Sequence, residues 1–302
     1  MRDALIKLHI SVFLAGFTGV LGALIQLNEG LLVWYRIMIT VVSLLALLQV
    51  KKQFQRIPAS MVWKLLGIGT LIALHWVFFY SSIKMANVSI GLVCFASTGL
   101  FTALLEPVFN QKKFSAWDVG LGLISLLGIL LIFQFDQRYR EGIIAGIVSA
   151  LLAALFTVLN KRQVNKVEPR VMMVYELSGG LLLLTLLMPV YLHYYPVTSL
   201  LPSLSDWLWL LILGWLCTVL AMDLMLQALQ KVSAFTQNLS LNLEPIYGIV
   251  LAFVLFGEQK QLGKSFYIGV LLITCSVVLQ MIRIVKQHKK NRGEEIAIIA
   301  ES

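Results

Sequence analysis

The residues best suited to chemistry in this chain are ionisable groups that lie inside long apolar runs. The stretch SLNLEPIYGIVLAFVLFGE, from Ser240 to Glu258, carries Glu244 and Pro245 in such a run. A carboxyl group there can bind a proton or a cationic group, and Pro245 cannot donate the hydrogen bond that continues a helix. The pair predicts a locally opened helix that presents polar groups to an internal site. The alternative is a structural kink in which a neutral Glu244 bonds to a neighbouring helix.

Further polar residues near Glu244 follow helical spacing. On a continuous helix with about 100° per residue, Gln237, Ser240 and Tyr247 share the face of Glu244. Asn242 lies on another face of the same helix. We include Gln237, Ser240 and Asn242 in the predicted site because they extend a polar surface along this helix.

A lone histidine lies near the middle of the apolar run LIALHWVFFYSS. His75 titrates near neutral pH and can relay protons, so we expect it to act together with Glu244. The neighbouring Trp76 and Tyr80 are candidates for the wall of an aromatic pocket. The alternative is that His75 and both aromatic residues only pack between helices.

Two ionisable residues lie about six residues from the end of their apolar runs. Arg36 either extends to the membrane interface or acts as a gate or as a partner for a substrate carboxylate. Glu176 either takes part in the site or anchors a helix end beside Lys166 and Arg170. The two lie near opposite ends of their spans, which argues against a direct salt bridge between them.

Two more carboxylates have two interpretations each. Asp223 is followed by Gln227 and Gln230 on one helical face, which predicts a wet surface or a hydrogen-bonded seam between helices. Glu106 lies near Lys112 and Lys113, and we expect it to be an interfacial carboxylate.

The elements that position these residues are membrane-spanning helices. The chain has 302 residues, of which 59% are hydrophobic and only 13% charged, against about 25% charged in soluble domains. The charges separate apolar runs long enough to cross about 30 Å of hydrocarbon. We predict an all-α integral membrane protein with ten spans at 5–26, 30–50, 61–83, 88–110, 116–134, 142–161, 170–193, 206–229, 233–256 and 264–285.

Lys and Arg residues are unevenly divided between the two sides of these spans. Of the 24, 18 fall on the side of both termini and five on the other, with Arg36 inside a span. The side rich in Lys and Arg faces the cytoplasm. We therefore expect a multi-pass protein of a bacterial plasma (inner) membrane with cytoplasmic N- and C-termini. The net charge of +9 follows from this orientation and does not indicate nucleic-acid binding.

The two halves of the chain resemble each other. The segment SIKMANVSIGLVCFASTGLF in the first half corresponds to LQALQKVSAFTQNLSLNLEP in the second. With five spans in each half, the second half begins on the opposite side of the membrane, so the repeats are inverted. Secondary transporters place a midplane site between such halves. We expect a first repeat at 1–135, a second at 136–286 and a cytoplasmic tail at 287–302.

These features resemble the EamA-type proteins of the drug/metabolite transporter superfamily. The matching residues are Arg36 early in the second span, Pro245, Gly257 and Glu258 in the ninth, and Gly269 in the last. The resemblance covers about residues 5 to 285 and implies export or uptake of small metabolites such as amino acids.

The first half departs from the family pattern at two places. Thr98-Gly99 takes the position of the usual proline, and Asn110-Gln111 takes the position of the terminal Gly-Glu. These differences leave open whether both halves contribute alike.

Signatures of other functions are missing from the sequence. It contains no HExxH, GxSxG, GxGD, Walker A or GxGxxG motif, so we expect neither an intramembrane enzyme nor a nucleotide or other cofactor. Cys94, Cys217 and Cys275 all lie in apolar runs without metal-ligand spacing, so no metal site is expected.

The sequence therefore predicts a permease or exporter that moves a small polar or amphiphilic metabolite by alternating access. Its partners are a small-molecule substrate, membrane lipids and a coupling proton bound at Glu244, and it works as a monomer or homodimer. The alternatives are a passive channel and, more strongly, a flippase of the same fold for a lipid or lipid-linked substrate.

Overall fold

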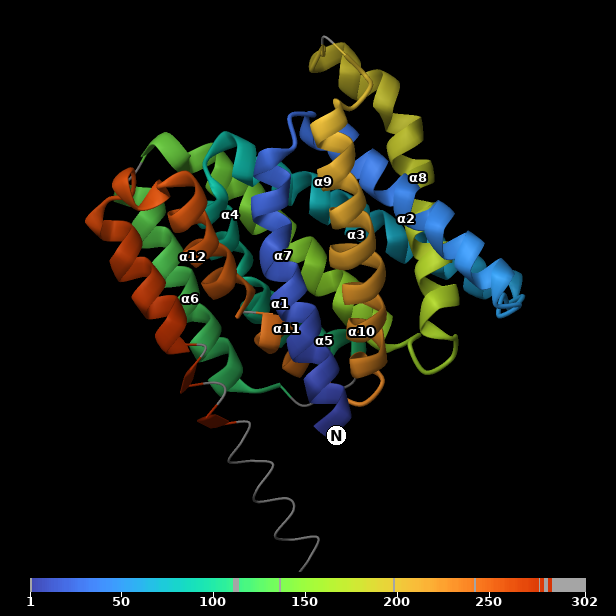
Figure 1. The fold of residues 1–302 in the computed structure, drawn as a ribbon. Coiled ribbons are helices and arrows are strands. Elements are labelled where there is room, and N and C mark those ends of the chain that lie inside the picture. Colours follow the sequence, from blue (N-terminus) through green and yellow to red (C-terminus); the bar gives the residue numbers. More distant parts are fainter. Residues whose placement is uncertain are drawn as a thin grey trace, which may run out of the picture.

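The protein is all-α in the residues that the computed structural model describes, which are 2–110, 114–135, 137–197, 199–241, 243–276, 278–279 and 282–283. Figure 1 shows helices throughout this part of the chain. The helices are α1 (Arg2–Leu24), α2 (Glu29–Val50), α3 (Ala59–Met85), α4 (Val88–Phe95), α5 (Thr98–Asn110), α6 (Ala116–Phe135), α7 (Arg140–Lys161), α8 (Pro169–Tyr194), α9 (Leu204–Gly214), α10 (Ala221–Leu229), α11 (Ala234–Leu241) and α12 (Glu244–Phe256), followed by the apolar helix Lys264–Ser276.

Three short elements complete the described chain. A π turn, η2 (Trp215–Leu220), joins α9 to α10. Two 3₁₀ turns lie between longer helices, η1 (Gln137–Tyr139) before α7 and η3 (Glu258–Lys260) after α12.

Many of these helices are long and apolar enough to cross a membrane. In the described residues, seven segments meet that requirement, and they correspond to seven of the ten predicted spans. The shorter apolar helices Ala116–Ile132, Glu244–Phe256 and Lys264–Ser276 fall within the other three. The all-α membrane prediction is confirmed, while the layout of ten helices in two repeats stays a prediction.

Helices from the two halves of the sequence are interleaved in space. The long α3 packs against α7 and α8, and the central α1 packs against α10 and α12 (Figure 1). Glycines allow the closest of these contacts. A Cβ atom on Gly69 of α3 would overlap the backbone of Glu176 on α8, and one on Gly180 would lie 2.8 Å from the Cβ of Ala73.

Two of the spans are broken at corresponding places. The predicted span 88–110 consists of α4, with 8 residues, and α5, with 13. The predicted span 233–256 consists of α11, with 8 residues, and α12, with 13. Pro245 accounts for the second break because it lies in the first turn of α12. At the first break there is no proline, and hydroxyl groups bond the carbonyls instead: Ser97 donates to Cys94 and Thr98 donates to Phe95.

A carboxylate from the other half of the chain caps the start of each broken span. The Glu258 carboxylate accepts hydrogen bonds from the backbone N–H groups of Val88 and Ser89 at 3.0 and 2.9 Å and from the Ser89 hydroxyl. The Glu106 carboxylate accepts from the backbone N–H of Ala234, the first residue of α11, at 3.2 Å. Acidic groups stabilise helix N-termini in this way. Glu106 is therefore a buried cap, and its depth at the membrane interface stays a prediction.

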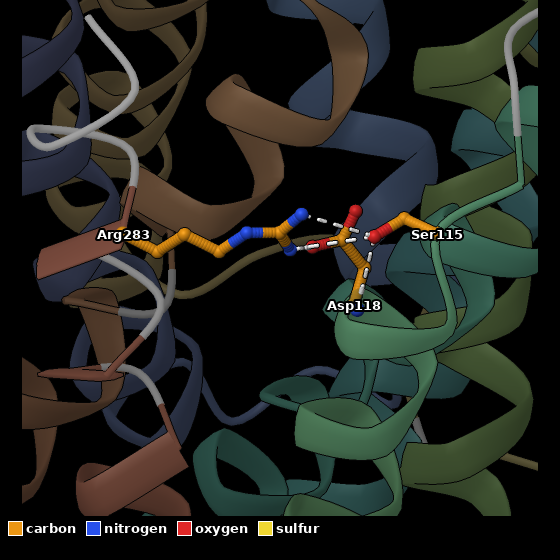
Figure 2. Close-up of polar contacts among 3 residues, drawn as sticks. All are labelled: Ser115, Asp118 and Arg283. Atoms are coloured by element: carbon orange, nitrogen blue, oxygen red, sulfur yellow. Dashed lines mark hydrogen bonds and ion pairs between the residues drawn. The ribbon is translucent and has the colours of Figure 1, made fainter. Parts of the chain in front are cut away.

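The last described residue also joins two segments that are far apart in the sequence. Figure 2 shows the Arg283 guanidinium directed at Asp118 and Ser115, at the start of α6. Arg283 forms an ion pair with Asp118 and donates hydrogen bonds of 3.3 Å to the Ser115 hydroxyl. This contact and the close approach of Gly128 to Gly269 hold the C-terminal helix against α6.

The contact between α3 and α8 predicts a difference between two glycines on one helix. Gly69→Ala will destabilise the protein by about 1–3 kcal/mol, because the added methyl meets backbone that cannot move aside. Gly67→Ala is the matched control, since no atom lies within 4 Å of a Cβ built there. Thermal unfolding of the two purified variants in detergent measures the difference. Equal melting temperatures would show that α3 and α8 do not approach each other this closely.

Candidate functional site

A buried cavity of about 100 Å³ lies where α1, α2, α3, α7, η2, α10 and the break between α11 and α12 meet. Most of its wall is apolar. Besides the Cys217 thiol, the ionisable side chains on it are Arg36, His75 and Glu244, which come from three separate spans. Typical ligand pockets hold about 300–1,000 Å³. The cavity is therefore smaller than a typical ligand pocket.

Arg36 is the most strongly held of the three. Its side chain is 2% exposed and its guanidinium carbon lies 3.8 Å from the centre of the Trp76 ring. Nε donates to the Thr218 hydroxyl at 2.8 Å and Nη1 donates to the Tyr80 hydroxyl at 2.9 Å. Arg36 therefore does not extend to the membrane interface, so that alternative is wrong. Within the described residues its partners are neutral, and the positive charge is not paired with a carboxylate.

The partner of Arg36 on the eighth predicted span depends on an irregular backbone. Thr218 lies in η2, and its hydroxyl donates to the Leu213 carbonyl, five residues earlier, at 2.8 Å. The Cys217 carbonyl oxygen lies 3.5 Å from Nη2 of Arg36. In a regular α-helix this carbonyl would be used by the backbone. Single π turns of this kind are frequent at functional sites.

His75 is tied to α7. Its Nδ1 lies 3.0 Å from the Ser149 carbonyl oxygen and 2.8 Å from the Ser149 hydroxyl oxygen. The Ser149 hydroxyl donates to the His75 carbonyl at 3.1 Å. Phe95 and Phe79 lie beside the ring, with centroids 5.4 and 6.1 Å away. The ring is thus held by Ser149 of α7 on one side and by two phenylalanine rings beside it.

Glu244 lies at the break between α11 and α12. It is 6% exposed and lies on the cavity wall. Among the described residues, no side chain or backbone group forms a hydrogen bond with its carboxyl. The helix opening predicted from Glu244-Pro245 is confirmed, because α11 ends at Leu241 and α12 begins at Glu244.

Of the other residues predicted near Glu244, those that the structure describes do not line the cavity. Gln237 and Ser240 are buried on α11 and do not line the cavity. Tyr247 packs edge-on against Phe13 of α1. Asn242 lies outside the described residues. The place of Gln237, Ser240 and Asn242 in the functional site stays a prediction.

Two other predicted site residues form separate contacts between helices. Asp223 accepts hydrogen bonds from Nε and Nη2 of Arg170 at 3.0 and 2.9 Å, which supports the seam between helices rather than the wet surface. Glu176 is fully buried against α3, and its Oε2 accepts from Asn160 at 3.4 Å. Neither of these carboxylates lines the cavity.

Sequence reasoning missed several residues that shape the cavity. Thr218 is the clearest, and its one signal is a hydroxyl in the apolar run GWLCTVL. Phe95 is another, and it closes the wall around His75. Phe95 belongs to the helix break at Ala96 and Ser97, which the sequence did not reveal because no proline marks it.

Comparisons with known proteins agree on one family. The model of the EamA-like transporter family matches residues 4–134 and residues 140–282. A Bacillus subtilis protein named uncharacterized transporter YdfC is 24% identical over 293 residues, which cover 93% of each chain. A Synechocystis protein named uncharacterized transporter sll1164 is 23% identical over 72% of this chain and 64% of its own length. A Haemophilus influenzae protein named uncharacterized transporter is 31% identical over 46% of this chain. The chain spans 64% and 49% of the Synechocystis and Haemophilus relatives, respectively.

A solved crystal structure supports the fold. It superposes with a TM-score of 0.68 and covers 95% of this chain and 99% of its own chain. The sequence identity is 17%, so the likeness concerns the fold alone.

The contacts of Arg36 predict that the hydroxyl group of Thr218 contributes to the stability of the protein and that its methyl group does not. Thr218→Val will lower stability by about 1–3 kcal/mol, because it leaves a buried Nε–H of Arg36 without an acceptor. Thr218→Ser keeps the oxygen and will stay close to the parent protein. Thermal unfolding in detergent gives both values. If the two variants unfold at the same temperature, the Arg36–Thr218 bond contributes nothing to the fold.

Proposed function

Because the chain belongs to the EamA-like transporter family, we propose that this membrane transporter carries a small polar or amphiphilic metabolite, such as an amino acid, through the cavity at Arg36 and Glu244. It works as a permease or exporter in the plasma membrane. The substrate occupies the cavity, which opens to each side of the membrane in turn. The small volume of the cavity favours a small solute over the lipid or lipid-linked substrate of a flippase.

The observation that carries the proposal is that a guanidinium and a carboxyl share one cavity without pairing with each other. Within the described residues, neither Arg36 nor Glu244 forms an ion pair. A buried charge without a counter-charge is costly. A substrate with a carboxylate at Arg36 and an ammonium group at Glu244 supplies both counter-charges at once. The apolar remainder of the wall then receives the side chain of the substrate.

The alternating access rests on a proposed layout of ten helices in two inverted repeats, 1–135 and 136–286, with 287–302 as a tail and both termini in the cytoplasm. The two segments that match the family model support this division. The equal lengths of α4 and α11 and of α5 and α12 support it as well.

In this layout the two helix caps lie on opposite sides of the membrane. Glu258 joins the outer end of α12 to the outer start of α4, and Glu106 joins the inner end of α5 to the inner start of α11. We assign them as the outer and inner gate contacts. Opening toward either side breaks one cap and leaves the other in place, so that the substrate meets one aqueous phase at a time.

Arg36 and Glu244 can be tested separately with matched ligands. The purified protein is screened by thermal shift against amino acids, each accompanied by the amine that lacks its carboxylate and the acid that lacks its amino group. Amino acids will stabilise the protein more than either analogue, because only they satisfy both charged groups. A ligand at 100 times its dissociation constant adds about 2.7 kcal/mol of stability.

The variants of this screen assign the two charges. Arg36→Gln will weaken the amino acid about 10- to 100-fold, in line with the loss of charged hydrogen bonds, and will leave the amine analogue unaffected. Glu244→Gln will also weaken the amino acid, and it will leave the acid analogue unaffected. An amino acid that binds both variants as it binds the parent would place the substrate site elsewhere.

We further propose that Glu244 couples transport to protons, with His75 as the relay. Glu244 then holds a proton on the return step and a cationic group of the substrate on the loaded step. In proteoliposomes, Glu244→Gln will abolish the response of net transport to an imposed pH gradient and will retain substrate counterflow. Glu141→Gln, an exposed carboxyl at the start of α7, is the control. An unchanged pH response in Glu244→Gln would exclude the coupling role.

A further inference from the structure

A second hollow lies at one end of the helix bundle, apart from the cavity at Arg36. Its volume is about 420 Å³, and it lies between the beginning of α3 and the end of α7. We call it the basic hollow because Lys64, Arg162 and Lys166 line it. None of its residues lines the first cavity.

The charge of the basic hollow is uncompensated. Three cations line it, and no acidic residue does. In the described part of the chain no carboxylate pairs with them, and the one polar contact of their side chains joins Lys166 to the Gln163 amide oxygen at 3.5 Å. Lys64 and Arg162 are exposed. Three neighbouring cations repel one another unless an anion lies between them.

The rest of the basic hollow is apolar and open. Ile68 and Leu159 form part of its wall. At Gly67 a Cβ atom would meet nothing within 4 Å, so the space beside α3 is empty of protein. Trp63, at the rim, is 72% exposed. A ligand for this site must therefore combine negative charge with an apolar part.

The position of the basic hollow relative to the bilayer indicates which ligand that is. Trp63 and Lys64 lie at the beginning of the predicted span 61–83, where tryptophan and basic residues meet the lipid headgroups. This end of the span lies on the side that carries 18 of the 24 basic residues. Basic pockets between membrane helices on that side bind anionic headgroups.

We propose that the basic hollow binds an anionic phospholipid, with the headgroup phosphate between Lys64, Arg162 and Lys166 and an acyl chain along Ile68 and Leu159. The lipid bridges α3 and α7. Both helices also line the cavity at Arg36, through His75 on α3 and Phe156 on α7, so the lipid stabilises the wall of that cavity from outside.

The experiment measures lipid binding to the purified full-length protein in detergent. Phosphatidylglycerol is titrated in a thermal-shift assay and by native mass spectrometry, with phosphatidylcholine and inorganic phosphate as the other two arms. Phosphatidylglycerol will raise the melting temperature in a saturable way, and the other two will not. A shift of equal size with phosphatidylcholine would overturn the charge recognition. A shift of equal size with inorganic phosphate would overturn the lipid assignment.

Two variants of different kinds locate the binding. Lys64→Gln combined with Arg162→Gln will weaken phosphatidylglycerol about 10- to 30-fold, since each basic residue contributes about 1 kcal/mol. The control carries Lys51→Gln and Lys231→Gln, which remove the same charge from exposed positions outside the basic hollow. If the control loses as much affinity, the binding is a general effect of surface charge and the proposal is wrong.

The second variant fills the space and leaves the charge unchanged. Gly67→Leu adds a side chain at a position where a Cβ atom meets nothing within 4 Å and replaces a glycine in a helix, so we expect the variant to keep its fold. It will lose the shift caused by phosphatidylglycerol. A retained shift would show that no acyl chain lies beside Gly67 and would overturn the proposed pose.

Discussion

The burial of the Arg36 guanidinium is the constraint on which the centre of the structure depends. In the absence of water, each of its N–H groups must find an acceptor in the protein. Tyr80 supplies one from α3, and η2 supplies two more through Thr218 and the Cys217 carbonyl. Both of these oxygen atoms belong to residues of the π turn, and Trp76 covers the guanidinium with its ring. Three spans are fixed relative to one another by a single side chain.

In the broken spans, backbone N–H and C=O groups likewise need hydrogen-bond partners. A helix that stops inside a membrane leaves N–H and C=O groups without partners. The chain resolves this with hydroxyls at Ser97 and Thr98 and a proline at position 245. At the start of each broken span it uses a carboxylate from the other half, Glu258 or Glu106. Each half of the chain therefore completes the other, and neither broken span is satisfied within its own half.

The sequence predicted those features that depend on one segment at a time. Apolar runs revealed the helices, Glu244-Pro245 revealed one break, and isolated polar residues pointed to Arg36 and His75. It did not predict what depends on a distant partner. The break at Ala96 and Ser97 has no proline, the π turn has no sequence signature, and the pairing of Asp223 with Arg170 joins residues 53 positions apart. Nor did the sequence show that Gln237 and Ser240 lie outside the cavity wall to which Glu244 belongs.

The ion pairs show by contrast what the cavity is arranged to do. Asp223 with Arg170, and Asp118 with Arg283 (Figure 2), are direct pairs near helix ends, where they fasten one helix to another. Arg36 and Glu244 also combine a basic and an acidic side chain, and they line one cavity. Neutral groups nevertheless hold the Arg36 guanidinium, and it forms no direct ion pair with Glu244. A direct pair would satisfy both charges and leave nothing for a ligand. Holding them apart by neutral contacts costs stability in the empty protein, and under the proposed function a zwitterionic substrate would recover that free energy on binding.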